Sequence, residues 1–294
     1  MDLHTYLAQC RELIDGALDR YLPPADASVD RLHEALRYSV LAPGKRLRPV
    51  LVLAGAEAVG GDPTTVIPTA CALECIHAFS LIHDDLPCMD DDDYRRGRLT
   101  SHKVFGEASA LLAGDALLAL AFELIAESAA QVPAGRGAAV VALIARASGT
   151  RGMVGGQVLD MAAEGRNVGG DALDQIHALK TGALITAAVT AGAMLCTDDV
   201  RSIEALQRYG QAVGLAFQIA DDILDVVGDE SKIGKPVGSD VRQDKMTYPR
   251  LYGIDESRRR AQTLVDEAIR ALSPLGPGAD PLRAIARYIV ERDV

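Results

Sequence analysis

Residues 81–98 read LIHDDLPCMDDDDYRRGR, and six of these eighteen residues are aspartates. An apolar run from Cys71 to Ile82 leads into them, so Asp84 and Asp85 stand at the end of an expected helix. Carboxylates this dense repel one another, more strongly in a cleft than in open water. Hard divalent cations, which take carboxylate ligands, would offset that repulsion. A solvated acidic loop that caps the next helix is the alternative for this stretch taken alone.

A second acidic cluster lies far down the chain, where residues 221–225 read DDILD. Asp221 and Asp225 are four residues apart, so a helix would present both carboxylates on one face. Both clusters follow apolar runs and fall near expected helix C-termini, where the helix dipole disfavours carboxylates by up to about 1 kcal/mol each. Two such placements would be unfavourable without cations, and we therefore predict a metal site at each.

The first cluster cannot continue as a plain helix, because Pro87 interrupts it. We therefore expect a bulge that brings Asp90 back beside Asp84. His77 lies seven residues before Asp84, hence on the same helix face and two turns deeper. An ordinary packed or surface histidine is the alternative for His77.

Helix follows helix along the rest of the chain. Apolar residues make up 49% of the composition, whereas aromatic residues make up 4% and Trp is absent, which suits closely packed helices. No sustained period-two alternation predicts a strand. We expect helices at residues 3–21, 28–41, 51–59, 64–86, 104–128, 132–149, 153–161, 172–195 and 199–227, with two or three more in 247–294. Their expected N-caps include Ser28, Thr64 and either Asp198 or Asp199. The predicted fold class is all-α, a single-domain helical bundle over residues 1–294.

Charge and composition exclude several classes of protein. The net charge of −11 argues against nucleic acid as a partner. The five cysteines contain no C-x-x-C, which favours a reducing, cytoplasmic location over a disulfide framework. The N-terminus shows no signal peptide. The most apolar stretch, Gly182 to Cys196, has 15 residues, short of the roughly 20 that span a bilayer, so no membrane span is expected.

Basic residues accompany the acids. Lys45, Arg46 and Arg48 lie beside a Pro-Gly turn before an expected helix, where free backbone N–H groups favour an anion. A basic surface turn is the alternative. Arg95 and Arg96 follow the first cluster and can fork onto phosphate oxygens. Mg²⁺ keeps few protein ligands and completes its shell with water and substrate phosphates. Phosphates at the mouth of a site with apolar helices below it describe a prenyl diphosphate.

Two further polar segments need an explanation. Residues 180–182 read KTG inside an expected apolar helix, where a Lys and a Thr are unfavourable unless they face a polar partner. Residues 228–245 form a polar loop with three glycines and four cations. That loop is long for a structureless connection in a compact domain, which predicts a functional lid.

Residues 81–97 resemble the first aspartate-rich motif of bacterial short-chain trans-prenyl diphosphate synthases, and FQIADDILD at residues 217–225 resembles the second. Matches in family order also occur at GKRLRP (44–49), KTG (180–182), GKP (234–236) and GSD (238–240). The resemblance covers nearly the whole chain and is closest to farnesyl diphosphate synthases. It implies a helical bundle of the isoprenoid synthase type around a central cavity, and a homodimer.

The resemblance also implies a role for each matching residue. The diphosphate of isopentenyl diphosphate would be held by Lys45, Arg48, His77 and Arg96. The diphosphate of the allylic substrate would be held by Arg95, Lys180, Lys235 and Lys245. The Mg²⁺ ligands would be Asp84, Asp90 and Asp221, with Asp85, Asp222 and Asp225 as further ligands or as their neighbours. Thr181 and Gln218 would offer oxygens near the allylic carbocation, and Lys180 would either bind the leaving diphosphate or stabilise its charge.

The implied reaction is ionisation, condensation and elimination, in which the isopentenyl double bond attacks the allylic cation and the departed diphosphate removes a proton. Phe79 and Ser80 precede Asp84 by five and four residues, about 6–7.5 Å up the helix. An aromatic residue there, with this form of the first motif, implies (2E,6E)-farnesyl diphosphate as the product. Geranylgeranyl diphosphate is the alternative, and Phe79 would then simply pack in the core.

Two other functions compete with a synthase. A terpene cyclase shares the first motif, but its second site usually mixes Asn or Asp with Ser or Thr and Glu, and this chain has no Trp and only four Phe. A non-catalytic subunit of a heteromeric synthase is expected to lose acidic motifs, and this chain keeps both. The sequence therefore favours the synthase over either rival.

Overall fold

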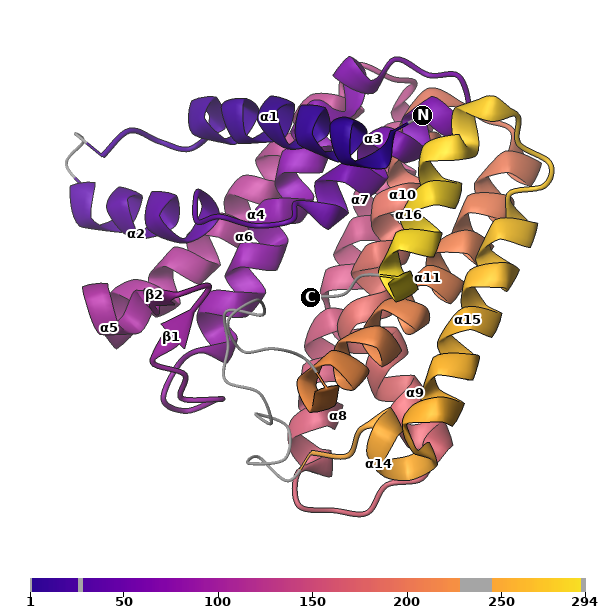
Figure 1. Cartoon of the computed structure of the whole chain (residues 1–294). Helices are drawn as coiled ribbons and strands as arrows, with labels where there is room; N and C mark the ends of the chain where they lie inside the picture. Colours follow the sequence, from indigo (N-terminus) through magenta and orange to yellow (C-terminus); the bar gives the residue numbers. More distant parts are fainter. Residues whose placement is uncertain (1, 26–28, 228–244, 292–294) are drawn as a thin grey trace.

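The computed structural model describes residues 2–25, 29–227 and 245–291, and it confirms the predicted all-α fold (Figure 1). The helices are α1 (Leu3–Tyr21), α2 (Asp30–Val40), α3 (Leu47–Ala58), α4 (Ile67–Asp84), α5 (Ser101–Phe105), α6 (Glu107–Ala129), α7 (Ala134–Ser148), α8 (Met153–Ala163), α9 (Gly170–His177), α10 (Ala183–Cys196), α11 (Val200–Val227), α14 (Tyr248–Tyr252), α15 (Ile254–Ala271) and α16 (Asp280–Glu291). Shorter elements are two 3₁₀ turns (Pro63–Val66 and Pro277–Ala279), a π turn (Ala178–Gly182) and two strands, β1 (Tyr94–Arg95) and β2 (Arg98–Leu99).

The two strands correct the expectation that the chain contains none. They pair in antiparallel fashion, with Arg95 opposite Arg98. Arg96 and Gly97 form the turn between them, with φ angles of 54° and 74°. Positive φ at both central residues matches the two-residue hairpin turn whose twist fits paired strands, and Gly adopts it without strain.

Several helix boundaries also differ from the expected ones. The helix expected at 104–128 is two helices, because the chain turns at Gly106 with φ of 86°. The expected cap Thr64 lies instead within a 3₁₀ turn that Asp62 caps, accepting a hydrogen bond from the Thr64 N–H. Asp199 is the cap of α11, accepting from the Ser202 N–H at 3.2 Å. The expected cap Ser28 lies outside the described residues.

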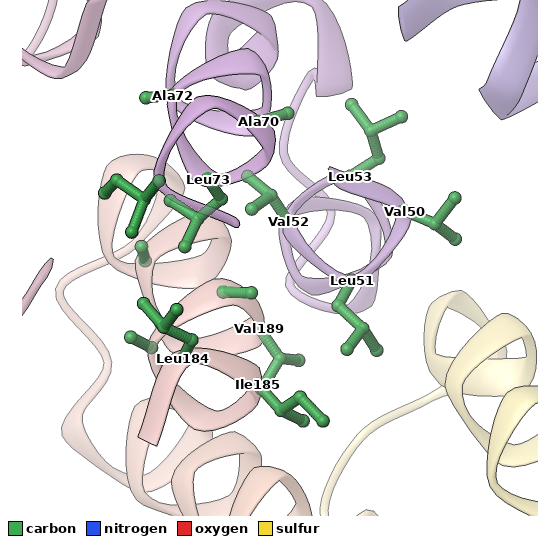
Figure 2. Close-up of a cluster of buried hydrophobic side chains, with 14 of the residues drawn as sticks. Val50, Leu51, Val52, Leu53, Ala70, Ala72, Leu73, Leu184, Ile185 and Val189 are labelled. Carbon is green, nitrogen blue, oxygen red and sulfur yellow. The ribbon is translucent and has the colours of Figure 1, made fainter. Parts of the chain in front are cut away.

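The centre of the bundle is α10, which packs against α3, α7 and α11. Figure 2 shows apolar side chains of α3, α4 and α10 meeting in one cluster, among them Leu51, Leu73 and Leu184, all fully buried. The α3 and α10 backbones approach so closely that a Cβ on Gly192 would lie 2.0 Å from the Val52 carbonyl oxygen. Glycine is therefore required at this crossing.

Three helical segments are long and apolar enough to span a membrane by length and composition, namely Pro63–Asp84, Glu107–Ala129 and Gly170–Cys196. Length and composition therefore do not exclude a membrane span as the 15-residue stretch Gly182 to Cys196 suggested, and the expected absence of a span stays a prediction. Their most apolar windows are 72%, 39% and 61% buried within the bundle, respectively. Packing against other helices accounts for the apolar character of the first and third segments, while α6 is less buried and exposes Leu111 and Leu112.

We expect Gly192→Ala to destabilise the protein by about 1–3 kcal/mol, because the added methyl group forces α3 and α10 apart. Thermal unfolding monitored by circular dichroism measures the effect. The matched control is Gly135→Ala in α7, where an added Cβ meets no atom within 4 Å and Ala is the better helix former. Equal melting temperatures for the two variants would contradict the close crossing.

Candidate active site

A cavity of about 540 Å³ opens between α4, α8 and α11. Charged side chains line it, among them Asp84, Lys180 and Asp221, and so do apolar side chains such as Phe79 and Met153. The cavity thus offers both charged and apolar contacts. This combination suits a ligand with an anionic head and a hydrocarbon tail.

The first acidic cluster bends as Pro87 predicts. Helix α4 ends at Asp84, and the Asp90 N–H donates a hydrogen bond to the Asp84 carbonyl oxygen at 2.8 Å. This contact brings the two aspartates together. Burial raises the pKa of Asp84 to about 6, the Asp90 carboxylate adds to the rise, and Lys180 opposes it. Asp84 is therefore a carboxylate that a further cation would stabilise in its charged form.

Asp85 points away from this cavity and is buried beside Arg95. The Arg95 Nε donates to Asp85 Oδ1 at 2.6 Å, and both residues line a smaller adjoining cavity of about 50 Å³. The structure therefore gives Asp85 a role in orienting Arg95. Its predicted contact with a metal stays a prediction.

In the second cluster, Asp221 lines the cavity and Asp222 does not. Asp222 is buried and accepts hydrogen bonds from the Gln218 Nε2 at 3.0 Å, the Tyr248 N–H at 3.0 Å and the His177 Nε2 at 3.3 Å. These bonds make Asp222 an anchor for its neighbours. Asp225 is half-buried one turn beyond Asp221 and does not line the cavity.

The predicted pair Thr181 and Gln218 meets in the cavity wall. The Thr181 hydroxyl donates to Gln218 Oε1 at 2.9 Å, while the amide nitrogen of Gln218 is held by Asp222. The amide therefore has one orientation, with its oxygen toward Thr181. Thr181 belongs to the π turn between α9 and α10, an irregularity that often marks functional sites.

Asp160 in α8 is a residue that the sequence reasoning missed. Its carboxylate lies 2.6 Å from the Lys180 Nζ and 3.8 Å from the Lys245 Nζ, and Lys245 also lies 3.7 Å from Asp90. The available signal was the pattern at residues 153–161, MVGGQVLDM, which places two polar residues three apart on an otherwise apolar helix. Gln157 is the other one, and it lines the same cavity.

Further cations and one histidine line the cavity. Arg48, His77 and Arg96 all do so, and the buried Arg48 Nε and His77 Nδ1 have no hydrogen-bond partner among the described residues. Burial holds the pKa of His77 well below its usual value, and the two arginines lower it further, so the ring is neutral. Gly44 leaves the space that Arg96 occupies, since a Cβ there would lie 2.6 Å from its Nη1. An unpartnered Arg48 donor beside this much positive charge suits an anion, and the predicted role of these residues in binding a diphosphate stays a prediction.

Among the described residues, three of the basic ones singled out in the sequence do not line this cavity, namely Lys45, Arg46 and Lys245. Lys245 lies instead with Asp160 at a separate small cavity. Arg46 is buried between Asp15 and Glu74, each 2.7 Å away, and stabilises the fold. Lys45 lines a separate cavity of about 230 Å³ between α1, α3 and α16. Lys235 and most of the expected lid at 228–245 lie outside the described residues.

The acidic residues suit Mg²⁺ only as a metal shared with a ligand. Within residues 2–25, 29–227 and 245–291, no group of three or more His, Cys, Asp or Glu side chains could hold an ion by itself. Mg²⁺ commonly takes one or two carboxylates and completes its shell with water and substrate phosphates. Asp84 and Asp221, which both line the cavity, fit that pattern, whereas Asp90 lies next to Asp84 in the chain bend but does not line the cavity.

The sequence of this chain is similar to those of known proteins over nearly its whole length. Residues 29–273 match the family model described as polyprenyl synthetase. The chain is 45% identical over 293 residues to a geranylgeranyl diphosphate synthase of Cyanophora paradoxa, covering 99% of this chain and 97% of that one. It is also 45% identical over 298 residues to the farnesyl diphosphate synthase of Escherichia coli (strain K12), covering 100% of both.

Solved structures give the same result. An FPP/GFPP synthase from Zymomonas mobilis superposes with a TM-score of 0.87 at 42% identity, covering 98% of each chain. A geranylgeranyl pyrophosphate synthetase from Pyrococcus horikoshii superposes with a TM-score of 0.89 at 35% identity, covering 98% of this chain and 99% of that one. The proteins similar to this chain in fold are therefore of the same kind as those similar to it in sequence.

We expect Asp160→Asn to lower the pKa of Lys180. Burial acts to lower that pKa, and the Asp160 and Asp84 carboxylates at present outweigh burial and raise it. Pulse labelling of the protein with acetic anhydride across a pH series, with Lys180 modification followed by mass spectrometry, measures the midpoint. Asp171→Asn, an exposed carboxylate on α9, is the control. A midpoint in Asp160→Asn equal to that of the wild type would show that Asp160 does not control Lys180.

Proposed function

The chain belongs to the polyprenyl synthetase family and is a short-chain trans-prenyltransferase, and from this we propose that it makes farnesyl diphosphate in a Mg²⁺-dependent reaction. Its substrates would be isopentenyl diphosphate and dimethylallyl or geranyl diphosphate. The observation that carries the proposal is a single cavity lined both by charged groups, among them Asp84, Lys180 and Asp221, and by apolar groups that include Phe79.

The cationic side chains would place the two diphosphates. Arg48, His77 and Arg96 border the cavity together and fit one diphosphate. Lys180 and Lys245 lie on either side of Asp160 and fit the other, with Arg95 held nearby by Asp85. Lys45 and Lys235 keep their predicted roles as proposals.

Mg²⁺ held by Asp84, Asp90 and Asp221 would supply positive charge to the leaving diphosphate. Lys180 adds to this charge, so the allylic C–O bond ionises with its negative product stabilised. The isopentenyl double bond then attacks the allylic cation, and the departed diphosphate takes the proton. Apolar walls exclude water, which would otherwise capture the cation.

Thr181 and Gln218 face the reacting end of the substrate. Their oxygens carry partial negative charge, and the hydrogen bond between them fixes both in place. Dipoles that are already oriented stabilise a developing positive charge without reorganisation. Asp222 contributes by holding the amide of Gln218.

Product length would be set by Phe79. Its side chain borders the cavity, is only 8% exposed, and lies five residues before Asp84 on α4. A tail that grows along α4 therefore meets an aromatic ring about 7.5 Å from the acids. Geranylgeranyl diphosphate is the second candidate, since the relatives carry both product names.

We further propose a homodimer that packs through α6. Leu111 and Leu112 on this helix are 45% and 57% exposed, although α6 is apolar enough to be a core helix. A second copy covering this face would bury it. The five cysteines are unpaired, which supports the proposed cytoplasmic location.

The purified protein, given Mg²⁺, dimethylallyl diphosphate and radiolabelled isopentenyl diphosphate, should yield a labelled C15 product. Chelation of the metal with EDTA should abolish incorporation, because the opposed carboxylates then have no cation to share with the diphosphate. Chromatography of the dephosphorylated products is the measurement. No incorporation would refute the synthase, and a cyclic hydrocarbon formed from a prenyl diphosphate alone would favour a cyclase.

We expect Phe79→Ala to raise the ratio of C20 to C15 product by about tenfold, which corresponds to about 1.4 kcal/mol between the competing transition states. The reason is that removal of the ring lets the tail extend further along α4. The matched control is Phe105→Ala, which removes an aromatic ring that packs against Tyr38 in α2 rather than lining the cavity. If Phe79→Ala kept the wild-type product ratio, a residue other than Phe79 would limit the length of the tail.

A further inference from the structure

We propose that His83, seated on Gly114 of α6, is a positioning residue for product length that holds the Phe79 ring across the cavity. This inference rests on the proposed function, because it concerns the length of the prenyl product. His83 immediately precedes Asp84 and lines the same cavity as Phe79. His83 is neither one of the proposed metal ligands nor one of the residues proposed to bind a diphosphate.

The His83 ring is fixed from two sides. Its Nε2 lies 3.1 Å from the Leu111 carbonyl oxygen of α6. A carbonyl can only accept, so this nitrogen carries the proton and donates. A second contact is with Phe79, whose ring meets the imidazole edge-on, with centroids 4.7 Å apart and planes at 73°. Edge-to-face contact at this distance is a favoured geometry for aromatic pairs. The Asp115 carboxylate also lies 3.9 Å from the His83 Nε2, on the same helix, α6, as the Leu111 carbonyl.

Gly114 makes this seat possible. A Cβ at position 114 would lie 2.2 Å from the His83 Nε2 and 2.5 Å from its Cδ2, closer than any real side-chain contact. Any other residue on α6 would therefore displace the imidazole. A displaced ring would also lose its hydrogen bond to the Leu111 carbonyl. The hydrogen bond therefore depends on glycine at position 114.

Phe79 depends on His83 because both side chains project from α4 one turn apart. Residues four apart on a helix lie on the same face, and this spacing places the Phe79 and His83 rings next to each other. With His83 held by α6, the Phe79 ring packs against a fixed surface. Without His83, space opens beside Phe79 and the ring is free to turn out of the path of the growing tail.

The test compares the ratio of C20 to C15 product in the wild type, His83→Ala, Phe79→Ala and the double variant. We expect His83→Ala to raise the ratio about tenfold, and the double variant to show no more than Phe79→Ala alone, because His83 acts through Phe79. The ratio is independent of how much folded enzyme is present, so a loss of stability does not move it. His33→Ala, which removes a half-buried imidazole on α2 that contacts the Pro24 carbonyl rather than the cavity, should leave it unchanged.

Two results would overturn the inference while leaving the synthase intact. One is a wild-type ratio in His83→Ala, and the other is an effect that multiplies independently with that of Phe79→Ala. Gly114→Ala tests the same point without altering α4, and its ratio must differ from that of Gly135→Ala. Equal ratios of C20 to C15 product in those two glycine variants would contradict the claim that Gly114 makes room for the His83 ring. A wild-type protein that incorporates no isopentenyl diphosphate would refute the proposed function instead.

Discussion

Negative charge at the C-terminal ends of two apolar helices is the constraint on which the rest of the site depends. Asp84 ends α4, and Asp221 to Asp225 lie near the end of α11, so each carboxylate faces the unfavourable end of its own helix dipole. Burial, together with the Asp90 carboxylate, raises the pKa of Asp84 and so adds to the cost of its charge. Nearby cations offset part of the negative charge, with Arg95 beside Asp85 and Lys245 beside Asp90 and Asp160.

In the proposed function, the cations of these ion pairs would also bind the diphosphate of the substrate. A diphosphate that entered the cavity would draw Lys180, Lys245 and Arg95 toward its own oxygens. The carboxylates Asp84, Asp90 and Asp160 would then need another cation, which Mg²⁺ bound with the diphosphate would supply. Acid–base pairs in the empty site would thus be replaced by base–phosphate and acid–metal pairs, and the total charge in a buried space would stay balanced.

The sequence was sufficient for the fold and for most of the site, and it failed where geometry depends on tertiary contacts. Pro87 correctly predicted the bulge that returns Asp90 to Asp84, because proline acts locally. It did not distinguish Asp84 from Asp85, since the direction of each side chain depends on the Arg95 hairpin. Asp160 was missed because its partners lie 20 and 85 residues away in the chain. The β1–β2 hairpin was missed because two residues per strand are too few for an alternating pattern.

The central claim is that the two acidic walls share one diphosphate through divalent cations. A crystal structure of the protein with Mn²⁺ and a non-reactive thiolo analogue of an allylic diphosphate tests it most directly, because Mn²⁺ accepts the same oxygen ligands and scatters anomalously. The account predicts anomalous peaks between the analogue and both walls, with Asp84 or Asp90 and Asp221 coordinated at about 2.0–2.2 Å. A bound analogue with no metal at either wall, or with its diphosphate away from both, would contradict it.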